Sequence, residues 1–272
     1  MHRPKKSLGQ NFLQDANVAQ KIVRLFHPQP GDNIMEIGPG KGALTSLILN
    51  VVPHITAIEL DDALSQELTV QFGDKLTLIH DDILNISFSD FSREDNKVRL
   101  IGNIPYNITS PILFHVIDFR EAVKDFVVMM QTEVAQRLVA VPRTKDYGIL
   151  SIFLQYYCTP KILFSVSKNS FFPVPNVSST IVHLDFQQQH ANKAADDALF
   201  RRVVRGTFNV RRKTLRNGLR QLGAPPAVFD SLSIDLDLRP EELTVQDFVT
   251  LSNELQNVAP AIVNTATEET HD

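Results

Sequence analysis

The stretch that decides the fold reads Asn33-Ile-Met-Glu-Ile-Gly-Pro-Gly-Lys-Gly-Ala-Leu44, an apolar run that passes through three glycines into a helical pattern. Glycine adopts positive φ and lets a ligand approach the backbone, so the chain turns sharply here from strand to helix. Gly38, Gly40 and Ala43 match the G-x-G-x-x-A spacing of a dinucleotide site, and Glu59 ends the next apolar run about 20 residues later. A carboxylate there accepts hydrogen bonds from ribose hydroxyls. A tight turn without a ligand is the alternative.

Short apolar runs and helical patterns alternate on both sides of this loop. Runs typical of strands lie at 33–37, 55–59, 76–80, 98–101 and 126–130. Helical patterns lie at 15–26, where Asp15 can cap the start, and at 43–49 and 63–72. Strand, helix and strand in alternation imply right-handed crossovers and a parallel sheet with helices on both faces. We therefore expect an α/β fold with a mostly parallel sheet.

The pattern changes after residue 130. Helices are predicted at 132–138 and 148–157, and strands at 161–166 and 178–186, which are expected to form an antiparallel edge hairpin. Residues 188–197 are polar and read as a linker, and residues 198–257 show only helical patterns. The sequence thus predicts a first domain over 1–187, a small all-helical domain over 198–257, and a disordered acidic tail over 258–272. Arg3, Lys5 and Lys6 are expected to form a flexible basic arm at the start of the first domain.

Composition excludes several classes of protein. The single cysteine, Cys158, rules out an internal disulfide and a cysteine zinc cluster, and it argues against pyrimidine C5 methylation, which needs a cysteine nucleophile. The eight histidines show no metal-site spacing, so we expect no metal. No apolar stretch approaches a membrane span or a secretory signal, so we expect a cytoplasmic protein that does not bind membranes. We also expect a monomer.

Two classes of cofactor fit the glycine loop. A nicotinamide dinucleotide carries a pyrophosphate, which negative charge repels. Glu36 lies two residues before the first glycine, and its charge suits the sulfonium and amino group of S-adenosylmethionine better. Glu36 as a buried hydrogen-bond partner of the loop is the alternative. Asp82 follows the third strand, where it can accept from an adenine amino group while Ile83 packs on the ring, although an Asp there also caps turns.

The most specific element is Asn103-Ile-Pro-Tyr106, which follows the fourth strand and so lines the crevice of an open α/β sheet. The exocyclic amine of adenine is a poor nucleophile, because its lone pair is delocalised into the ring. Two acceptors that hold its hydrogens let the nitrogen pyramidalise and attack an electrophilic methyl group. The Asn103 side-chain oxygen and the Ile104 carbonyl can be those acceptors, since Pro105 keeps the preceding residue extended. Tyr106 offers a face for stacking the base, unless it is simply a core residue after a turn.

The net charge of −4 conceals a strongly basic segment. Eight cations and no acid lie within residues 201–220, namely Arg201, Arg202, Arg205, Arg211, Arg212, Lys213, Arg216 and Arg220. The rest of the chain then holds 19 basic and 31 acidic residues, a net charge of −12. Such a run is often a solvated face, but like charges this dense repel one another unless a polyanion is near. We predict phosphate binding, with Arg202, Arg211, Arg212 and Lys213 as RNA contacts.

These motifs, taken together, resemble the ribosomal RNA adenine dimethyltransferase family, and most closely its small-subunit branch. The resemblance spans about residues 5 to 255 and rests on Asn11-Phe-Leu13, Glu36-Ile-Gly-Pro-Gly40, Glu59, Asp82, Asn103-Ile-Pro-Tyr106 and Phe171-Phe-Pro-Val-Pro-Asn-Val-Ser178. It implies a class I, Rossmann-like methyltransferase fold in which S-adenosylmethionine contacts Asn11, Leu13, Gly38, Glu59, Asp82 and Asn103. It also implies that Tyr106 and Phe171 sandwich the target base. The family often has Leu where Ile104 stands, but only the backbone of this residue is used.

The resemblance further implies the substrate, which is two adjacent adenosines in the 3′-terminal hairpin of 16S rRNA within the 30S subunit or its precursor. Two alternatives stay open. One is a 23S rRNA adenine methyltransferase of the macrolide-resistance type, and the other is a non-catalytic rRNA-binding assembly factor. Intact Asn103 and Tyr106 argue against the second alternative.

Overall fold

The computed structural model describes residue 5 and residues 9–187 and 193–258. The chain divides into two compact units, one of Met1–Ala135 with Tyr157–Gln188 and one of Gln136–Tyr156 with Gln189–Asp272. Arg3 and Lys6, the first half of the predicted linker and the predicted tail from 259 onward lie outside the described residues. The predicted division into domains over 1–187 and 198–257 stays a prediction.

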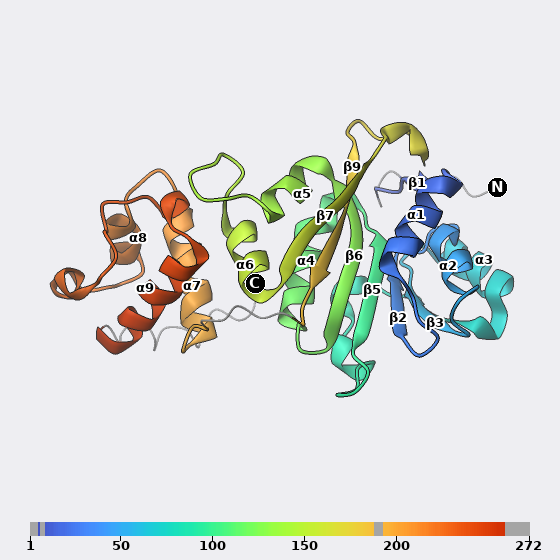
Figure 1. Ribbon diagram of the computed structural model, residues 1–272, viewed down its shortest axis with the longest axis horizontal. Coiled ribbons are helices and arrows are strands. Elements are labelled where there is room, and N and C mark those ends of the chain that lie inside the picture. The colour runs from blue at the N-terminus through green and yellow to red at the C-terminus, as the bar shows by residue number, and fades with distance from the viewer. Residues whose placement is uncertain (1–4, 6–8, 188–192, 259–272) are drawn as a thin grey trace. The chain divides into compact units, whose positions relative to one another are not determined.

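The first unit is built on strands that pair mostly in parallel. Its strands are β1 (Phe12–Leu13), β2 (Asn33–Ile37), β3 (Ile55–Ile58), β4 (Leu76–Ile79), β5 (Val98–Asn103), β6 (Val123–Gln131), β7 (Thr159–Val166), β8 (Phe171–Phe172) and β9 (Ser179–Asp185). Seven of them form one sheet in the order β4-β3-β2-β5-β6-β9-β7 (Figure 1). The pairs from β4 to β6 are parallel, and β9 is antiparallel to β6 and β7. The predicted parallel sheet and its antiparallel edge hairpin are confirmed.

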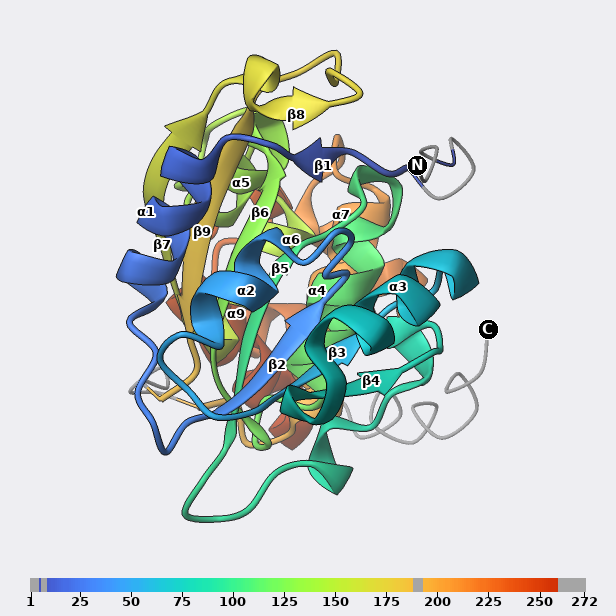
Figure 2. The same ribbon diagram turned by 90° about the vertical axis from the view of Figure 1, so that its right-hand side faces the viewer.

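Helices cover this sheet. They are α1 (Ala16–Phe26), α2 (Ala43–Ile48), α3 (Asp62–Phe72) and α4 (Thr109–Asp118). Figure 2 shows α1 and α2 in front of the sheet and α4 behind it. As predicted, α1 begins after Asp15, whose carboxylate accepts from the backbone N–H groups of Asn17 and Val18. Its buried residues share one apolar cluster with Leu44 of α2 and Ile34 of β2, which attaches both helices to the sheet.

One helix and two short strands were not predicted from the sequence. Helix α4 carries Pro111 in its first turn, where proline is tolerated because the N–H groups have no intrahelical partner. Strands β1 and β8 have two residues each, too few to show a period, and they pair with each other in a separate sheet. Figure 2 shows this pair near one end of the main strands.

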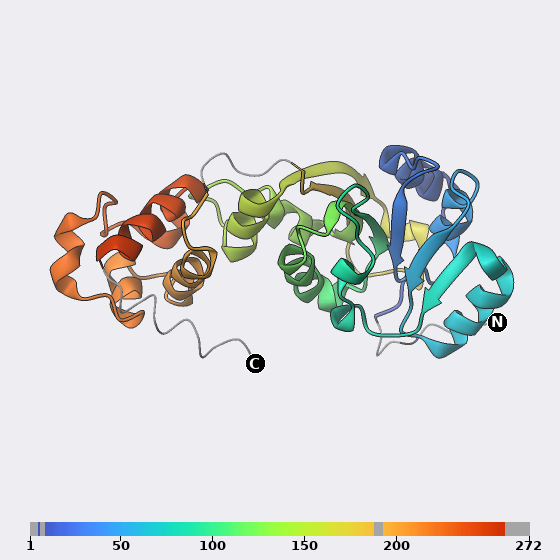
Figure 3. The ribbon, with the colours of Figure 1, turned by 90° about the horizontal axis from the view of Figure 1, so that it is seen from below.

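The second unit is helical in its described C-terminal part, as predicted (Figure 3). It contains α7 (Asp197–Asn209), α8 (Leu215–Gln221) and α9 (Val245–Val258), while α5 (Thr132–Leu138) and α6 (Ile149–Tyr157) lie at the boundaries between the units along the chain. A Cβ atom on Gly218 would lie 2.9 Å from the Cα of Thr207, so glycine permits close packing of α8 on α7. A capping box precedes α9, since Thr244 and Asp247 exchange hydrogen bonds.

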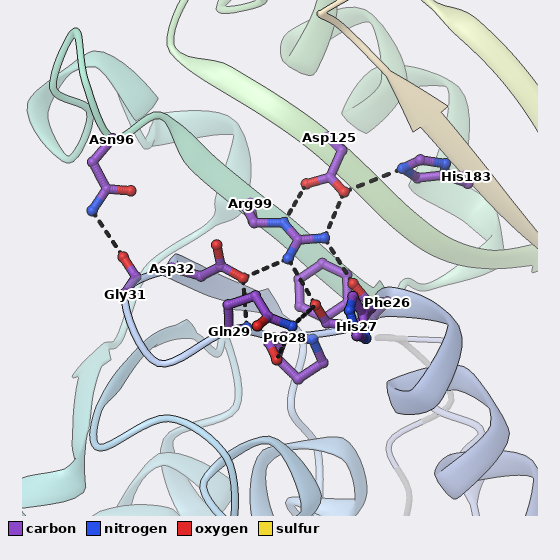
Figure 4. A network of polar contacts seen from close by, with 10 residues as sticks. All are labelled: Phe26, His27, Pro28, Gln29, Gly31, Asp32, Asn96, Arg99, Asp125 and His183. Atoms are coloured by element: carbon purple, nitrogen blue, oxygen red, sulfur yellow. Dashed lines mark hydrogen bonds and ion pairs between the residues drawn. The ribbon is translucent and has the colours of Figure 1, made fainter.

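A buried ionic network lies in the first unit (Figure 4). Arg99, in β5, donates from Nε and Nη2 to both carboxylate oxygens of Asp125, each at 2.8 Å. It also donates to the side chain of Asp32 and to the backbone carbonyls of Phe26 and His27. One guanidinium thereby joins β5, β6 and the loop between α1 and β2.

Candidate active site

A cavity of about 290 Å³ opens where the carboxyl ends of the central strands meet. Strand β2 pairs with β3 on one side and with β5 on the other. The chain crosses over from β2 to β3 on one side, and β5 lies on the other side, so the topological switch point lies between β2 and β5. Open α/β sheets bind ligands at this point. The six predicted cofactor-binding residues all line this cavity, as does Tyr106: they are Asn11, Leu13, Gly38, Glu59, Asp82 and Asn103. The structure therefore brings together residues from five separate parts of the chain.

The glycine loop takes the conformation that its composition predicts. Gly38, Gly40 and Gly42 have φ values of 66°, 60° and 75°, which residues with a side chain rarely adopt. A Cβ atom on Gly40 would lie 3.1 Å from the ring of Phe12, which packs against the loop. The loop is thus kept close to the N-terminal segment that crosses it.

Two carboxylates below the loop are shielded from water. Glu59 accepts hydrogen bonds from the backbone N–H groups of Gly40 (3.1 Å) and Asp61 (3.0 Å), yet burial raises the pKa of its carboxyl. Glu36 accepts a hydrogen bond of 2.6 Å from the hydroxyl of Thr45, and burial raises the pKa of Glu36 to about 7. Glu36 therefore has a side-chain partner in the loop helix and also lines the cavity.

Asp82 has two roles that the sequence left as alternatives. It lines the cavity, and it also caps the 3-10 turn Ile83–Asn85 by accepting from the N–H of Leu84 at 3.0 Å. Since the cap uses Oδ1, the carboxylate position is fixed at the cavity edge.

The tetrapeptide after β5 is held by contacts that its sequence did not reveal. The Asn103 amide nitrogen donates to the backbone carbonyl of Asn11 at 2.9 Å. The Tyr106 hydroxyl lies 2.6 Å from the hydroxyl of Ser179, and burial raises the pKa of Tyr106. Tyr106 is thus attached to β9, and Asn103 to the N-terminal segment.

The two phenylalanines of the β8 segment have opposite environments. Phe171 is 2% exposed and belongs to the apolar core, where it pairs with Leu13 across β1 and β8. Phe172 is 51% exposed. Phe171 is not among the described residues that line the cavity.

The predicted RNA-binding residues of the second unit differ in their surroundings. Arg212 and Lys213 are exposed, whereas Arg202 is half-buried. Arg211 donates to the carboxylate of Glu241 at 2.6 Å and to the backbone carbonyl of Lys145 at 3.1 Å. Arg212 and Lys213 are therefore more accessible to a phosphate than Arg211.

Sequence reasoning overlooked Gln10, Asp61 and Ser179. Gln10 precedes the recognised Asn11, and Asp61 follows Glu59 by two residues, but their contact joins positions that are 51 residues apart. No local pattern could have found that pair. Within the described ranges, no group of three or more His, Cys, Asp or Glu side chains is placed to hold a metal ion, and no helix is long and apolar enough to cross a membrane.

Comparison with known proteins agrees with this geometry. A family model described as ribosomal RNA adenine dimethylase matches residues 1–257. The chain is 43% identical over 256 residues to ribosomal RNA small subunit methyltransferase A of Acinetobacter baylyi, with 93% of each protein covered. It is 42% identical to the protein of the same name from Aromatoleum aromaticum, covering 95% of this chain and 97% of that protein.

Solved structures support the fold. A dimethyladenosine transferase from Plasmodium falciparum superposes with a TM-score of 0.73 at 24% identity, covering 90% of this chain and 98% of that one. The 23S rRNA methyltransferase ErmE gives a TM-score of 0.67 at 21% identity, covering 90% and 99%. The predicted Rossmann-like methyltransferase fold is confirmed. The chain belongs to the ribosomal RNA adenine dimethylase family and is a ribosomal RNA adenine dimethyltransferase.

Proposed function

We propose that this enzyme uses S-adenosylmethionine to dimethylate the exocyclic amines of two adjacent adenosines in the 3′-terminal hairpin of 16S rRNA. The substrate is the 30S subunit or its precursor, and the enzyme acts as a cytoplasmic monomer. One observation carries the proposal: the Asn103 amide nitrogen is bonded to the Asn11 carbonyl at the edge of the glycine-loop cavity. The identity to small-subunit methyltransferases, 43% and 42%, supports the choice of subunit.

The charge of the cavity suits this cofactor. Four acidic side chains and one lysine line it, namely Glu36, Glu59, Asp81, Asp82 and Lys41. A cationic sulfonium fits such a wall, whereas the pyrophosphate of a dinucleotide would be repelled. When bound, S-adenosylmethionine supplies an electrophilic methyl group.

Each side chain has a definable task toward the cofactor. Glu59 and Asp82 line the cavity, and we propose that Glu59 accepts from ribose hydroxyls and Asp82 from the adenine amino group. Gly38 lets the backbone approach the ligand, and Asn11 and Leu13 close the cavity from the N-terminal segment. All are binding roles, and none requires a change of protonation.

The tetrapeptide orients the amine that is methylated. Because Nδ2 of Asn103 is bonded to Asn11, Oδ1 is left to accept one hydrogen of the amine, and the carbonyl of Ile104 accepts the other. The nitrogen then directs its lone pair at the methyl group, and orientation in place of covalent catalysis lowers the barrier. Stacking on Tyr106 contributes about 1–3 kcal/mol toward the few kcal/mol that base extrusion costs.

The second stacking partner stays a prediction. Phe171 is buried against Leu13, so a sandwich of the adenine between Phe171 and Tyr106 requires the β8 segment to rearrange when RNA binds. Arg202, Arg211, Arg212 and Lys213 are proposed to contact the phosphates, as predicted from the cation run.

Labelled S-adenosylmethionine and 30S particles from a strain without this activity provide the test. We expect label in dimethyladenosine of 16S rRNA. Asn103→Ala should abolish transfer while the protein stays folded and unfolds cooperatively, and Asn17→Ala, an exposed position in α1, is the matched control. A parallel reaction with 50S particles tests the alternatives: label in 23S rRNA and none in the 30S particles would favour a resistance methyltransferase, and 30S binding without transfer would favour an assembly factor.

A further inference from the structure

A chain of hydrogen bonds leads from the start of α3 to the N-terminal segment that covers the cavity. The amide nitrogen of Gln10 donates to Oδ2 of Asp61 at 2.9 Å, and the Gln10 oxygen accepts from the backbone N–H of Lys5 at 2.8 Å. The Lys5 ammonium lies 3.0 Å from Oδ1 of Asp61. The Asp61 side chain is completely shielded from solvent, and the Lys5 ammonium and the Gln10 amide face its two carboxylate oxygens.

We call residues 9–13 the strap. At its start, Gly9 has a φ of 62°, and a Cβ atom there would lie 2.8 Å from Oδ1 of Asn107, so the backbone crosses closely over the tetrapeptide loop. At its end, β1 pairs with β8, and Gln14 donates its backbone N–H to the carbonyl of Ser170 at 2.8 Å. Between these two ends, Gln10 attaches the strap to α3.

The strap acts on the reacting group through Asn11. A carboxamide presents an acceptor on one side and donors on the other. The bond from Asn103 Nδ2 to the Asn11 carbonyl therefore decides which side of Asn103 faces the cavity. A flipped amide would offer N–H groups to the substrate amine, which is itself a donor, and would hinder the reaction. Asp61 also donates its backbone N–H to Glu59 at 3.0 Å.

We propose that Gln10 is a positioning residue: its contact with Asp61 holds the strap so that the Asn11 carbonyl fixes the Asn103 carboxamide with its oxygen toward the adenine. This inference rests on the proposed function of Asn103. It assigns a task to two residues, Gln10 and Asp61, which lie outside both the glycine loop and the tetrapeptide.

The contact can be broken and rebuilt without removing either side chain. Gln10→Glu places two carboxylates against each other, and Asp61→Asn places an amide nitrogen against an amide nitrogen. The double variant restores one amide and one carboxylate with exchanged positions. Asparagine also keeps the cap of α3, where Asp61 accepts from Ala63 N–H at 3.1 Å. Gln66→Ala is the control, because Gln66 makes a similar amide-to-carboxylate bond with Asp62 on the exposed side of α3.

Three measurements should be made on each purified variant: kcat with 30S particles, the Kd for those particles, and hydrogen exchange of the peptide covering residues 5–14 without cofactor. A hydrogen bond to a charged group is worth about 1.5–3 kcal/mol, so each single variant should lose about tenfold or more in kcat. The Kd should stay unchanged, exchange should accelerate, and the double variant should recover most of both losses. The control should match the wild type.

The outcomes separate the two proposals. Single variants with wild-type kcat, or a double variant as impaired as the singles, would overturn the role of the Gln10 contact. Unaltered exchange in the single variants would do the same. If the wild type itself transfers no methyl group to 30S particles, the proposed function fails, while the exchange measurement still reports whether the contact holds the strap.

Discussion

Replacement of Arg99 by Met tests how the sheet beneath the active site is held together. Methionine keeps an unbranched apolar stem and removes the guanidinium, which donates twice to Asp125 and also to Asp32 and two backbone carbonyls. Asp125 is 5% exposed, so its charge would remain buried without its main partner. Only the contact of 3.2 Å with His183 would be left among the ionic contacts that Asp125 makes in Figure 4.

The size of the effect follows from this burial. Breaking a buried ion pair by removing one partner costs about 3–5 kcal/mol, and since His183 still faces Asp125 we expect about 3 kcal/mol near neutral pH. Urea unfolding monitored by circular dichroism measures this loss. Arg24→Met, at an exposed position of α1, is the control and should change stability by less than about 0.5 kcal/mol.

The loss should depend on pH in a defined direction. Burial acts to raise the pKa of Asp125, but hydrogen bonds from Arg99 and His183 outweigh it and lower the pKa. In the wild type, the contacts of ionised Asp125 stabilise the fold at pH values above the ordinary carboxyl pKa. This stabilisation is lost as pH falls through the lowered pKa of Asp125. Without Arg99, burial raises the pKa of Asp125. As pH falls, Asp125 of the variant is therefore protonated, and the cost of its buried charge disappears.

The stability difference should therefore be larger at about pH 8 than at about pH 5. A difference below about 1 kcal/mol, or one that does not vary with pH, would refute the reasoning, because a buried charge left alone must cost more than that. Arg99 lies in the same strand as Asn103 but does not line the cavity. Activity per folded molecule should therefore not change.

Three further predictions concern the candidate site, the sheet beside it and the proposed RNA contacts. Burial raises the pKa of Glu36 to about 7, so wild-type stability should fall by about 3 kcal/mol as pH rises from about 5 to about 8, and Glu36→Gln should remove this dependence in urea unfolding. Gly102→Ala should cost about 1–3 kcal/mol in the same assay, because its Cβ would lie 2.6 Å from the Ile37 carbonyl oxygen. Replacing Arg212 and Lys213 with Ala should weaken 30S binding and flatten the slope of log K against log salt by about 1–2; an unchanged slope would count against phosphate contacts.

Local patterns predicted much of the fold. The glycine run, the branched apolar runs and the Asp15 cap depend on neighbours within a few residues, and the structure contains the turn, strands and helix start that they predict. Helix α4 was not predicted because Pro111, in its first turn, interrupts the helical pattern of the sequence, although a helix tolerates proline there.

The candidate site was predicted in its parts and not in its assembly. The residues chosen for cofactor binding line one cavity, but the sequence did not indicate that Asn103 would be oriented by Asn11 or Tyr106 by Ser179. These contacts join positions 92 and 73 residues apart. Phe171 shows the converse, because its motif pointed to the site and packing placed it in the core.

The sequence alone determined the kinds of element and the chemistry available at their ends, because propensity, period and turn residues act over a few positions. Tertiary structure decided the strand order, which set Gly38 after β2 beside Asn103 at the end of β5. It also decided the contact of Gln10 with Asp61 and the burial of Glu36. Register and burial depend on how all strands and helices pack at once, and no short stretch of sequence carries that information.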